Sequence, residues 1–116
     1  MRFIVTGPNG YSDRDAVKEL IDRLAAKYDS PIVMTRARKG GLDKVIEYFA
    51  WKVWLTTEGY YPESAANPKL ALQGQITTMA KKADKAFIFF DGKDAETADA
   101  IRILSNMGIK GKIIKY

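Results

Sequence analysis

Hydrophobic positions along the chain alternate between two spacings, which predicts strands and helices in turn. Short β-branched or aromatic runs mark strands, while apolar residues three and four positions apart mark the inner faces of helices. In chain order, the pattern predicts strands at 2–6, 31–35, 52–57, 85–90 and 112–115, and helices at 13–27, 42–49, 69–82 and 95–106. Between these elements, residues 58–68 break both spacings and form an unusually long connection, of the kind that is often functional.

Regular alternation of strands and helices is typical of a parallel sheet with crossover helices. We therefore expect an α/β fold: a Rossmann-like, open, mainly parallel five-stranded sheet with helices on both faces. The 116 residues are enough for one core and are predicted to form a single domain, 1–116. If every crossover is right-handed, the turns after the first, second and fourth strands converge at one sheet edge, where ligands bind in such folds.

Composition limits the chemistry that this edge can perform. The chain contains neither cysteine nor histidine, which excludes thiolate nucleophiles and cysteine metal sites and removes the usual general base. No metal spacing is visible, so we expect neither a metal nor a cofactor. A net charge of +5 favours anionic partners in general. No apolar stretch approaches the roughly 20 residues that span a bilayer, and residues 2–6 suit a strand better than a signal peptide, so we predict a cytoplasmic protein without membrane contact.

The turn after the first strand carries Gly7, Pro8, Asn9 and Gly10, and then Tyr11. Its shape suits one wall of a ligand site, although the glycines could equally serve only to relieve a tight turn. The next helix is predicted to start with a box of Ser12 and Asp15, as capping pairs do. Asp13 and Asp15 put negative charge in that first turn, where they would repel a phosphate.

The turn after the second strand is basic instead, with Arg36, Arg38 and Lys39 before the pair Gly40 and Gly41. We expect a ligand phosphate to meet this turn. The alternative is a solvated loop that aids solubility. After the fourth strand, Asp94 and Glu96 again place acid at a helix start. That turn is expected to contact a ribose or a base.

Aromatic residues fall into two groups. Trp51 and Trp54, with Tyr48 and Phe49, are predicted to fill the interior, because such rings more often fill a core than stack on a ligand, which is the alternative. Tyr60 and Tyr61 lie instead in the long connection, where their rings could cover a bound base.

Several dispersed segments resemble one family. Residues 2–24 resemble a strand, a G-S-R-x-Y-x-D turn and a first helix, with Gly7, Tyr11 and Asp13 matching. Residues 37–43 are similar to an A-x-G-A-D turn and keep Gly41 and Asp43. The segment 75–97 resembles a pattern R-N-x-x-M, then A-D, then a strand ending in D-G-x-S-x-G-T. These motifs belong to the YspA-type branch of the SLOG superfamily of Rossmann-like domains.

This resemblance implies a nucleotide or nucleotide-derived ligand at the strand ends, and homo-oligomers. The chain departs from the pattern at its phosphate loop. Glu96 replaces the glycine before Thr97, and Ala100 stands three residues after Thr97, where hydrolases of the superfamily carry a glutamate. The resemblance therefore implies the fold and the ligand class more than hydrolysis.

We predict a binding protein that senses or sequesters a nucleotide-derived small molecule. The residues predicted to contact it are Gly7, Pro8, Asn9, Tyr11, Arg36, Arg38, Gly40, Gly41, Asp43, Asp91, Gly92, Lys93 and Thr97. One alternative is a nucleotide phosphoribohydrolase that uses Asp91, Glu96 or Asp99 as its carboxylate. Another is a module that binds nucleic acid or protein, which the scattered basic residues allow but do not favour. Nothing in the residues decides between a cellular and a phage or mobile-element origin.

Overall fold

Strands and helices alternate throughout residues 1–62 and 67–116, the part of the chain that the structure, a computed structural model, describes. In order, the elements are β1 (Arg2–Thr6), α1 (Arg14–Lys27), β2 (Ile32–Thr35), α2 (Leu42–Lys52), β3 (Thr56–Gly59), α3 (Pro68–Ala80), β4 (Lys85–Phe90), α4 (Ala95–Asn106) and β5 (Lys110–Lys115). All five strands pair in parallel. The predicted α/β class is confirmed, and the sheet is wholly parallel.

The strands lie in the order β3-β2-β1-β4-β5. The chain moves outward from β1 to β3 and then crosses back to place β4 on the other side of β1. This reversal puts the switch point of the sheet between β1 and β4. At their carboxyl ends, adjacent connections leave toward opposite faces, and this opens the crevice in which such folds bind ligands.

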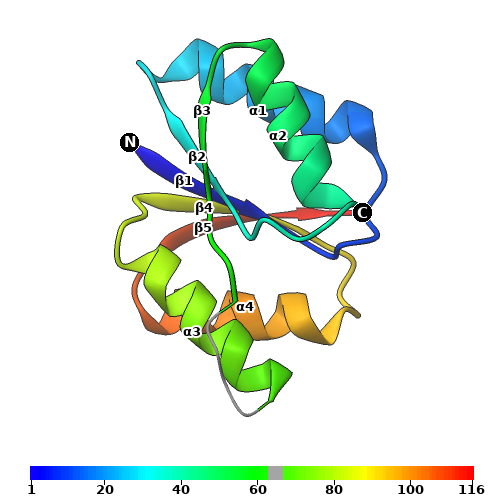
Figure 1. Cartoon of the computed structure of the whole chain (residues 1–116), viewed down its shortest axis with the longest axis vertical. Coiled ribbons are helices and arrows are strands. Elements are labelled where there is room, and N and C mark those ends of the chain that lie inside the picture. Colours follow the sequence, from blue (N-terminus) through cyan, green and yellow to red (C-terminus); the bar gives the residue numbers. More distant parts are fainter. Residues whose placement is uncertain (63–66) are drawn as a thin grey trace.

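Two helices cover each face of the sheet (Figure 1). Helices α1 and α2 pack on one face, around Phe3, Val5 and Phe89. On the other face, α3 and α4 enclose a second cluster around Ile4, Met34 and Ile88. Because successive strand residues point to opposite sides, β1 contributes alternately to both clusters, which makes it the most buried strand of the fold.

Helix α1 begins one residue later than predicted, and a different side chain caps it. Asp13 is the N-cap, and its Oδ1 accepts a hydrogen bond of 3.1 Å from the backbone N–H of Ala16. The expected box of Ser12 and Asp15 does not form the cap. Aspartate competes well with serine for this position, so the Ser-Asp spacing alone did not locate the boundary.

The boundary between α2 and β3 was predicted wrongly. Of residues 52–57, only Thr56 and Thr57 belong to a strand: α2 continues to Lys52, and β3 begins at Thr56. Trp54 adopts a left-handed conformation, φ 64°, and the N–H of Leu55 donates to the carbonyl of Ala50 at 2.9 Å. This bond pattern closes the helix as a Schellman motif, in a position that usually carries glycine.

The two tryptophans therefore do not fill the core. Trp51 is 70% exposed and Trp54 93% exposed, and Tyr48 is also exposed, while Phe49 packs partly buried against the α1–α2 cluster. Tyr48 and Trp51 thus lie on the outer side of α2 and Trp54 lies just beyond its end, contrary to the prediction, and of these four residues only Phe49 contributes to the core.

Smaller differences occur elsewhere. Helix α3 starts at Pro68, capped by the side chain of Asn67, and β5 starts at Lys110, two residues earlier than predicted. The long connection after 58 is shortened by β3, which extends to Gly59. Residues 63–66 of that connection lie outside the described residues.

Candidate functional site

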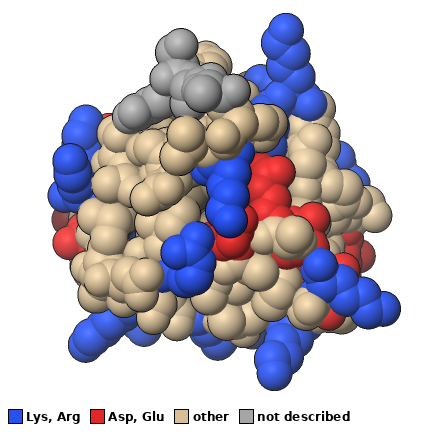
Figure 2. Space-filling view, turned by 90° about the horizontal axis from the view of Figure 1, so that it is seen from below, with Lys and Arg blue, Asp and Glu red and all other residues tan. Residues whose placement is uncertain are grey.

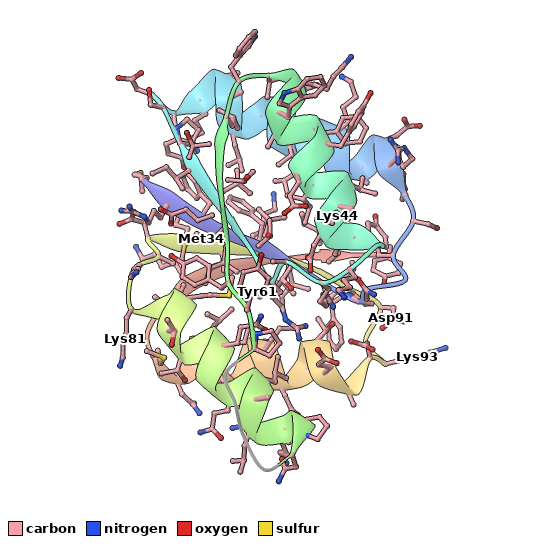
Figure 3. The ribbon with its side chains drawn as sticks, in the orientation of Figure 1. Met34, Lys44, Tyr61, Lys81, Asp91 and Lys93 are labelled. Carbon is pink, nitrogen blue, oxygen red and sulfur yellow. The ribbon has the colours of Figure 1, made fainter. Side chains whose placement is uncertain are left out.

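The predicted convergence of three turns is present at the carboxyl edge of the sheet. The turns after β1, β2 and β4 are held together by direct contacts. Arg38 Nη2 donates to the carbonyl of Gly7 at 2.9 Å, and the N–H of Leu42 donates to the carbonyl of Asn9 at 3.0 Å. Arg36 contacts Glu96 at the start of α4. Figure 3 shows Asp91 and Lys93 at this edge and Lys81 at the opposite edge.

Gly7 is required by packing between layers. A Cβ atom there would lie 2.8 Å from the carbonyl oxygen of Phe89 and 3.1 Å from a methyl of Leu42. The glycine thus lets the end of β1 approach both β4 and α2 closely, as expected where backbones meet. It serves the switch point of the sheet and does not itself offer open space to a ligand.

The rest of the turn after β1 forms one side of the carboxyl edge, which we call the wall. The carbonyl of Pro8 accepts from the N–H of Tyr11 at 3.0 Å, which closes the turn and leaves Asn9 exposed at its tip. The Tyr11 ring is buried and stacks on Phe89 with centroids 4.6 Å apart. Burial raises the pKa of the Tyr11 hydroxyl, and nearby Asp13 acts in the same direction. Tyr11 therefore anchors the wall to the sheet.

Arg38 is bound by the protein itself. Its Nε and Nη2 donate to the two carboxylate oxygens of Asp43 at 2.8 and 3.2 Å, and its backbone N–H donates to the same carboxylate at 2.9 Å. Asp43 is fully buried in the first turn of α2. A bidentate pair of this kind fixes the turn after β2 and neutralises the charge predicted to hold phosphate.

Arg36 lies in a second buried cluster, on the other face of the sheet. It is 6% exposed, and its Nε donates to Gln75 Oε1 at 2.8 Å while its Nη2 donates to Glu96. Gln75 in turn donates to the carbonyls of Arg36 and Tyr60. Burial lowers the pKa of the Arg36 guanidinium, and nearby Arg38 acts in the same direction. The cluster joins β2, α3 and α4.

The two glycines of the basic turn have different surroundings. Both have positive φ, 69° at Gly40 and 68° at Gly41. A Cβ at Gly41 would lie 2.3 Å from the carbonyl oxygen of Asn9, whereas Gly40 has open space around it. Gly41 therefore allows the turns after β1 and β2 to touch. Gly40 gives the turn its conformation.

The turn after β4 is organised by its own carboxylates. Asp91 Oδ1 accepts from the N–H groups of Lys93 and Asp94 at 2.8 and 3.1 Å, and these bonds lower the pKa of the Asp91 carboxyl. Asp94 caps α4 and accepts from both the N–H and the hydroxyl of buried Thr97. Gly92 has φ 86°, and Lys93 extends into solvent (Figure 3).

The three carboxylates considered for catalysis each have a partner. Asp91 accepts from backbone N–H groups, Glu96 pairs with Arg36, and Asp99 lies 3.6 Å from Arg102 one turn along α4. A depressed pKa keeps Asp91 ionised, which does not suit a general acid at neutral pH. These partners favour structural roles for the three side chains.

A hollow of about 460 Å³ borders the wall formed by the turn after β1. Its lining consists of Asn9, Gly10, Tyr11, Ser12, Arg14, Gly41, Lys44, Val45 and Tyr48. It therefore includes three of the predicted contacts, Asn9, Tyr11 and Gly41. The other predicted residues lie outside this lining.

The hollow lies against the amino-terminal end of α2. Gly41 is the N-cap and supplies no side-chain cap, and the backbone N–H groups of Asp43 and Lys44 have no acceptor among residues 1–62 and 67–116. Such free N–H groups, together with the helix dipole, attract anions. The carboxylate of Asp43 in the same turn is neutralised by Arg38.

Two cations and a ring at the hollow were missed from sequence. The Arg14 guanidinium lies 5.5 Å from the centroid of the Tyr48 ring, and Lys44 pairs with Glu47 at 3.2 Å while remaining exposed. One signal was available. Arg14 and Lys44 both lie in the first turn of a helix, where a cation interacts unfavourably with the helix dipole. Helix stability therefore does not account for these two cations, and this indicates another role.

The tyrosines of the long connection lie elsewhere. The Tyr60 hydroxyl donates to Glu58 at 3.1 Å and its ring packs against the α3–α4 cluster, whereas the Tyr61 ring is exposed. Figure 2 shows the side of α3 and α4, where acidic and basic side chains are mixed. This surface has no single sign of charge.

Comparison of the chain with models of known protein families finds no match, and no curated protein matches it either. The resemblance to the SLOG superfamily thus stays a prediction. Among the described residues, no helix combines the length and the apolar character needed to cross a bilayer. The same residues contain no group of three or more side chains suited to hold a metal ion.

Proposed function

We propose that this protein binds a small molecule carrying a phosphate and an aromatic base, that is, a nucleotide or a nucleotide derivative. The observation that carries the proposal is the hollow at the amino-terminal end of α2, where free backbone N–H groups, Arg14 and Lys44 surround about 460 Å³ of space. Pockets that hold small ligands have volumes of roughly 300 to 1,000 Å³.

In this proposal, the phosphate binds at the first turn of α2, between Lys44 and Arg14, and Asn9 and Ser12 supply polar contacts. The exposed ring of Tyr48 stacks on the base. The proposed phosphate contacts thus differ from Arg36 and Arg38, which the sequence predicted and which carboxylates neutralise more completely. Sensing or sequestering by a cytoplasmic homo-oligomer remains the expected role.

A thermal-shift screen tests the proposal. Purified protein is heated with AMP, NAD, ADP-ribose, cyclic nucleotides or free bases in turn. A ligand present at about 100 times its dissociation constant stabilises a protein by roughly 2.7 kcal/mol, which raises the melting temperature by about 4 to 8 °C per kcal/mol in a domain of this size.

Matched variants show where the ligand binds. Lys44→Ala should abolish most of the shift, because it removes a cation from the hollow. Lys39→Ala is the control, since Lys39 is an exposed cation of the same turn region that does not line the hollow. No shift with any ligand, or equal loss in both variants, would contradict the proposal.

A further inference from the structure

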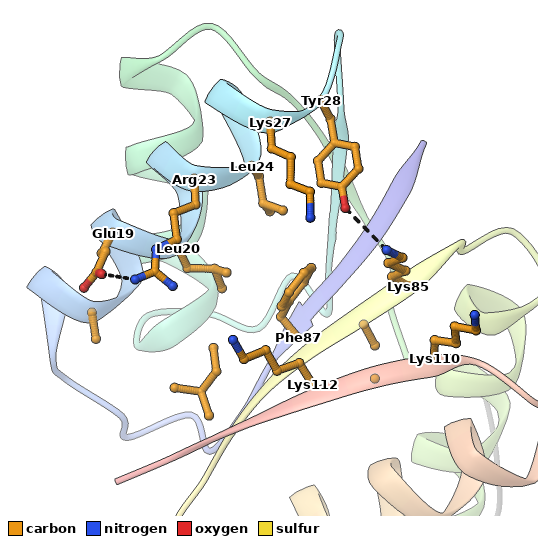
Figure 4. A pocket seen from close by; sticks show the side chains of 14 residues that line it. Glu19, Leu20, Arg23, Leu24, Lys27, Tyr28, Lys85, Phe87, Lys110 and Lys112 are labelled. Carbon is orange, nitrogen blue, oxygen red and sulfur yellow. Dashed lines mark hydrogen bonds and ion pairs between the residues drawn. The ribbon is translucent and has the colours of Figure 1, made fainter.

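The face of the sheet that carries α1 and α2 is not fully covered. Both helices belong to the cluster over β1, and β5 lies at the sheet edge beyond β4. Between α1 and these two strands lies a groove of about 640 Å³ (Figure 4). It shares no lining residue with the hollow at the carboxyl edge. We call it the α1–β5 groove.

The floor of the α1–β5 groove is apolar. Leu20 and Leu24 contribute from α1, and Phe87 and Ile114 contribute from β4 and β5. Phe87 and Ile114 are only partly buried, although they point toward the same side as the α1–α2 core. In a doubly wound fold, helices normally cover both faces of the sheet, so partly exposed apolar side chains at this place leave room for a partner.

The rim is strongly basic. Five cations line the groove, namely Arg23, Lys27, Lys85, Lys110 and Lys112, against one carboxylate, Glu19, which pairs with Arg23. In the part of the chain that the structure describes, none of the four lysines forms an ion pair with a carboxylate. Figure 4 shows Lys27, Lys85, Lys110 and Lys112 around the open space.

Two of these lysines are in register on neighbouring strands. Lys85 of β4 pairs with Lys110 of β5, and Lys112 follows two residues later on the same face. Like charges side by side on a sheet destabilise it. Lys85 is relieved only in part, through a 3.4 Å contact with the Tyr28 hydroxyl. An anionic partner lying in the groove would remove this repulsion.

We propose that the α1–β5 groove binds an acidic amphipathic helix of a protein partner. A helix is about 10 to 12 Å across, and strands lie about 4.8 Å apart, so a helix would cover β4 and β5 together. Its apolar face would lie on Phe87 and Ile114, which are partly exposed apolar side chains of the groove. Its flanking carboxylates would meet Lys27 on one side and Lys112 on the other.

A second copy of this chain suits the groove poorly. A two-fold arrangement of β5 against β5 would bring two basic rims together, with five cations and one carboxylate from each copy. Charge complementarity therefore selects a partner of opposite sign. A nucleic acid would satisfy the cations but would leave the apolar floor unused.

Synthetic helices provide the probe. Three labelled 18-residue acidic peptides, with leucine on one helical face and glutamate on its flanks in three registers, are titrated with the full chain by fluorescence anisotropy. Binding should be at least about tenfold tighter than to a scrambled peptide of equal composition, since the scrambled peptide lacks an apolar face. A peptide with lysine in place of glutamate should not bind.

Charge reversal locates the binding. The double variant Lys110→Glu and Lys112→Glu should weaken binding at least about tenfold, because two rim cations become repulsive. The control is Lys69→Glu with Lys81→Glu, which changes the net charge equally at exposed positions of α3 and its C-cap. It should change binding less than about twofold, as screened distant charges do.

Any of these peptide results would overturn the proposal: no binding of any acidic peptide, equal effects of the two double variants, equal binding of the scrambled peptide, or displacement of the peptide by single-stranded DNA. A dimer that dissociates on reversal of Lys110 and Lys112 would also overturn it, because the groove would then be occupied by a second copy.

Discussion

At the scale of single residues, Arg38 and Asp43 show how a charged pair at the carboxyl edge of the sheet can stabilise the fold. The Asp43 carboxylate is fully buried, and three hydrogen bonds from Arg38 satisfy it. Arg38 also reaches the carbonyl of Gly7, so the pair connects the ends of β1 and β2 with the start of α2. Removing one partner would leave the other charge without its counterion inside the protein.

We predict that Asp43→Ala lowers the free energy of unfolding by about 3 kcal/mol, because it leaves the Arg38 guanidinium without a counterion and the Arg38 backbone N–H without its acceptor. Urea denaturation followed by circular dichroism measures the change. Asp22→Ala is the control, since Asp22 pairs with Lys18 on the surface. It should cost about 0.5 kcal/mol. Equal losses would show that the buried pair has no special role.

Trp54 carries a backbone conformation that suits glycine. Its φ of 64° ends α2, and its side chain is almost wholly exposed. We predict that Trp54→Gly raises the free energy of unfolding by about 0.5 to 1 kcal/mol, since it removes the left-handed strain without loss of packing. Trp51→Gly, within the helix, should lower it by a similar amount. Paired denaturation curves test both, and a loss at Trp54 would argue for a hidden contact.

At the scale of elements, the close approach of β1, β4 and α2 depends on one position. A side chain at Gly7 would collide with the backbone of Phe89 and with Leu42. The same turn contains Gly10, where a Cβ would meet nothing within 4 Å. Gly7 is thus needed for packing between elements, whereas Gly10 affects only the local shape of the turn.

Gly7→Ala should therefore destabilise the protein by about 1 to 3 kcal/mol, as overpacking of a close contact does. Gly10→Ala should be neutral or slightly stabilising, because it restricts the unfolded chain. Thermal unfolding of the two variants beside the wild type measures the difference. If both variants melt together, the contact at Gly7 can relax.

Periodicity predicted every strand and helix in the right order, because each buried run has the spacing of its element. The start of β3 was wrong for a physical reason. Residues 52–57 contain β-favouring residues, and the Schellman motif at the end of α2 has Trp54 at the left-handed position, where a glycine would have marked the end of the helix. Trp51 lies on the exposed side of α2 and Trp54 follows its end, so the aromatic residues suggested a core where the chain has surface.

At the scale of the whole molecule, the sequence predicted which turns meet but not which cations remain accessible. The meeting of the turns follows from parallel topology and right-handed crossovers. The accessibility of Arg36 and Arg38 depends on Gln75, Glu96 and Asp43, which come from three different helices. Gln75 and Glu96 lie 39 and 60 residues from Arg36 in the chain and leave no local pattern, whereas Asp43 lies only five residues from Arg38. The sequence therefore placed the basic turn at the carboxyl edge of the sheet, but it did not show that Arg36 and Arg38 are paired within the protein.

Alkaline pH should weaken the fold. Burial raises the pKa of the Tyr11 hydroxyl above its unfolded value of about 10. The folded state thus holds the proton more tightly, and this stability is complete below about pH 10 and is lost as the pH rises through the folded pKa. Tyr11→Phe should make the fall in unfolding free energy between about pH 9.5 and 11.5 shallower. Denaturant titrations across this range test it, and an unchanged slope would contradict the assignment.

Among the strands of residues 1–62 and 67–116, β5 is at the sheet edge with β4 as its one neighbour, so its outer side presents unpaired backbone groups to other molecules. Lys110, Lys112 and Lys115 place charge along this edge. Lysines on edge strands hinder the growth of sheets between molecules. Alanine at these three lysine positions would then favour fibrils during storage and expression, whereas glutamate there would keep the protein soluble. The concentration of protein that stays in solution over time would show the difference.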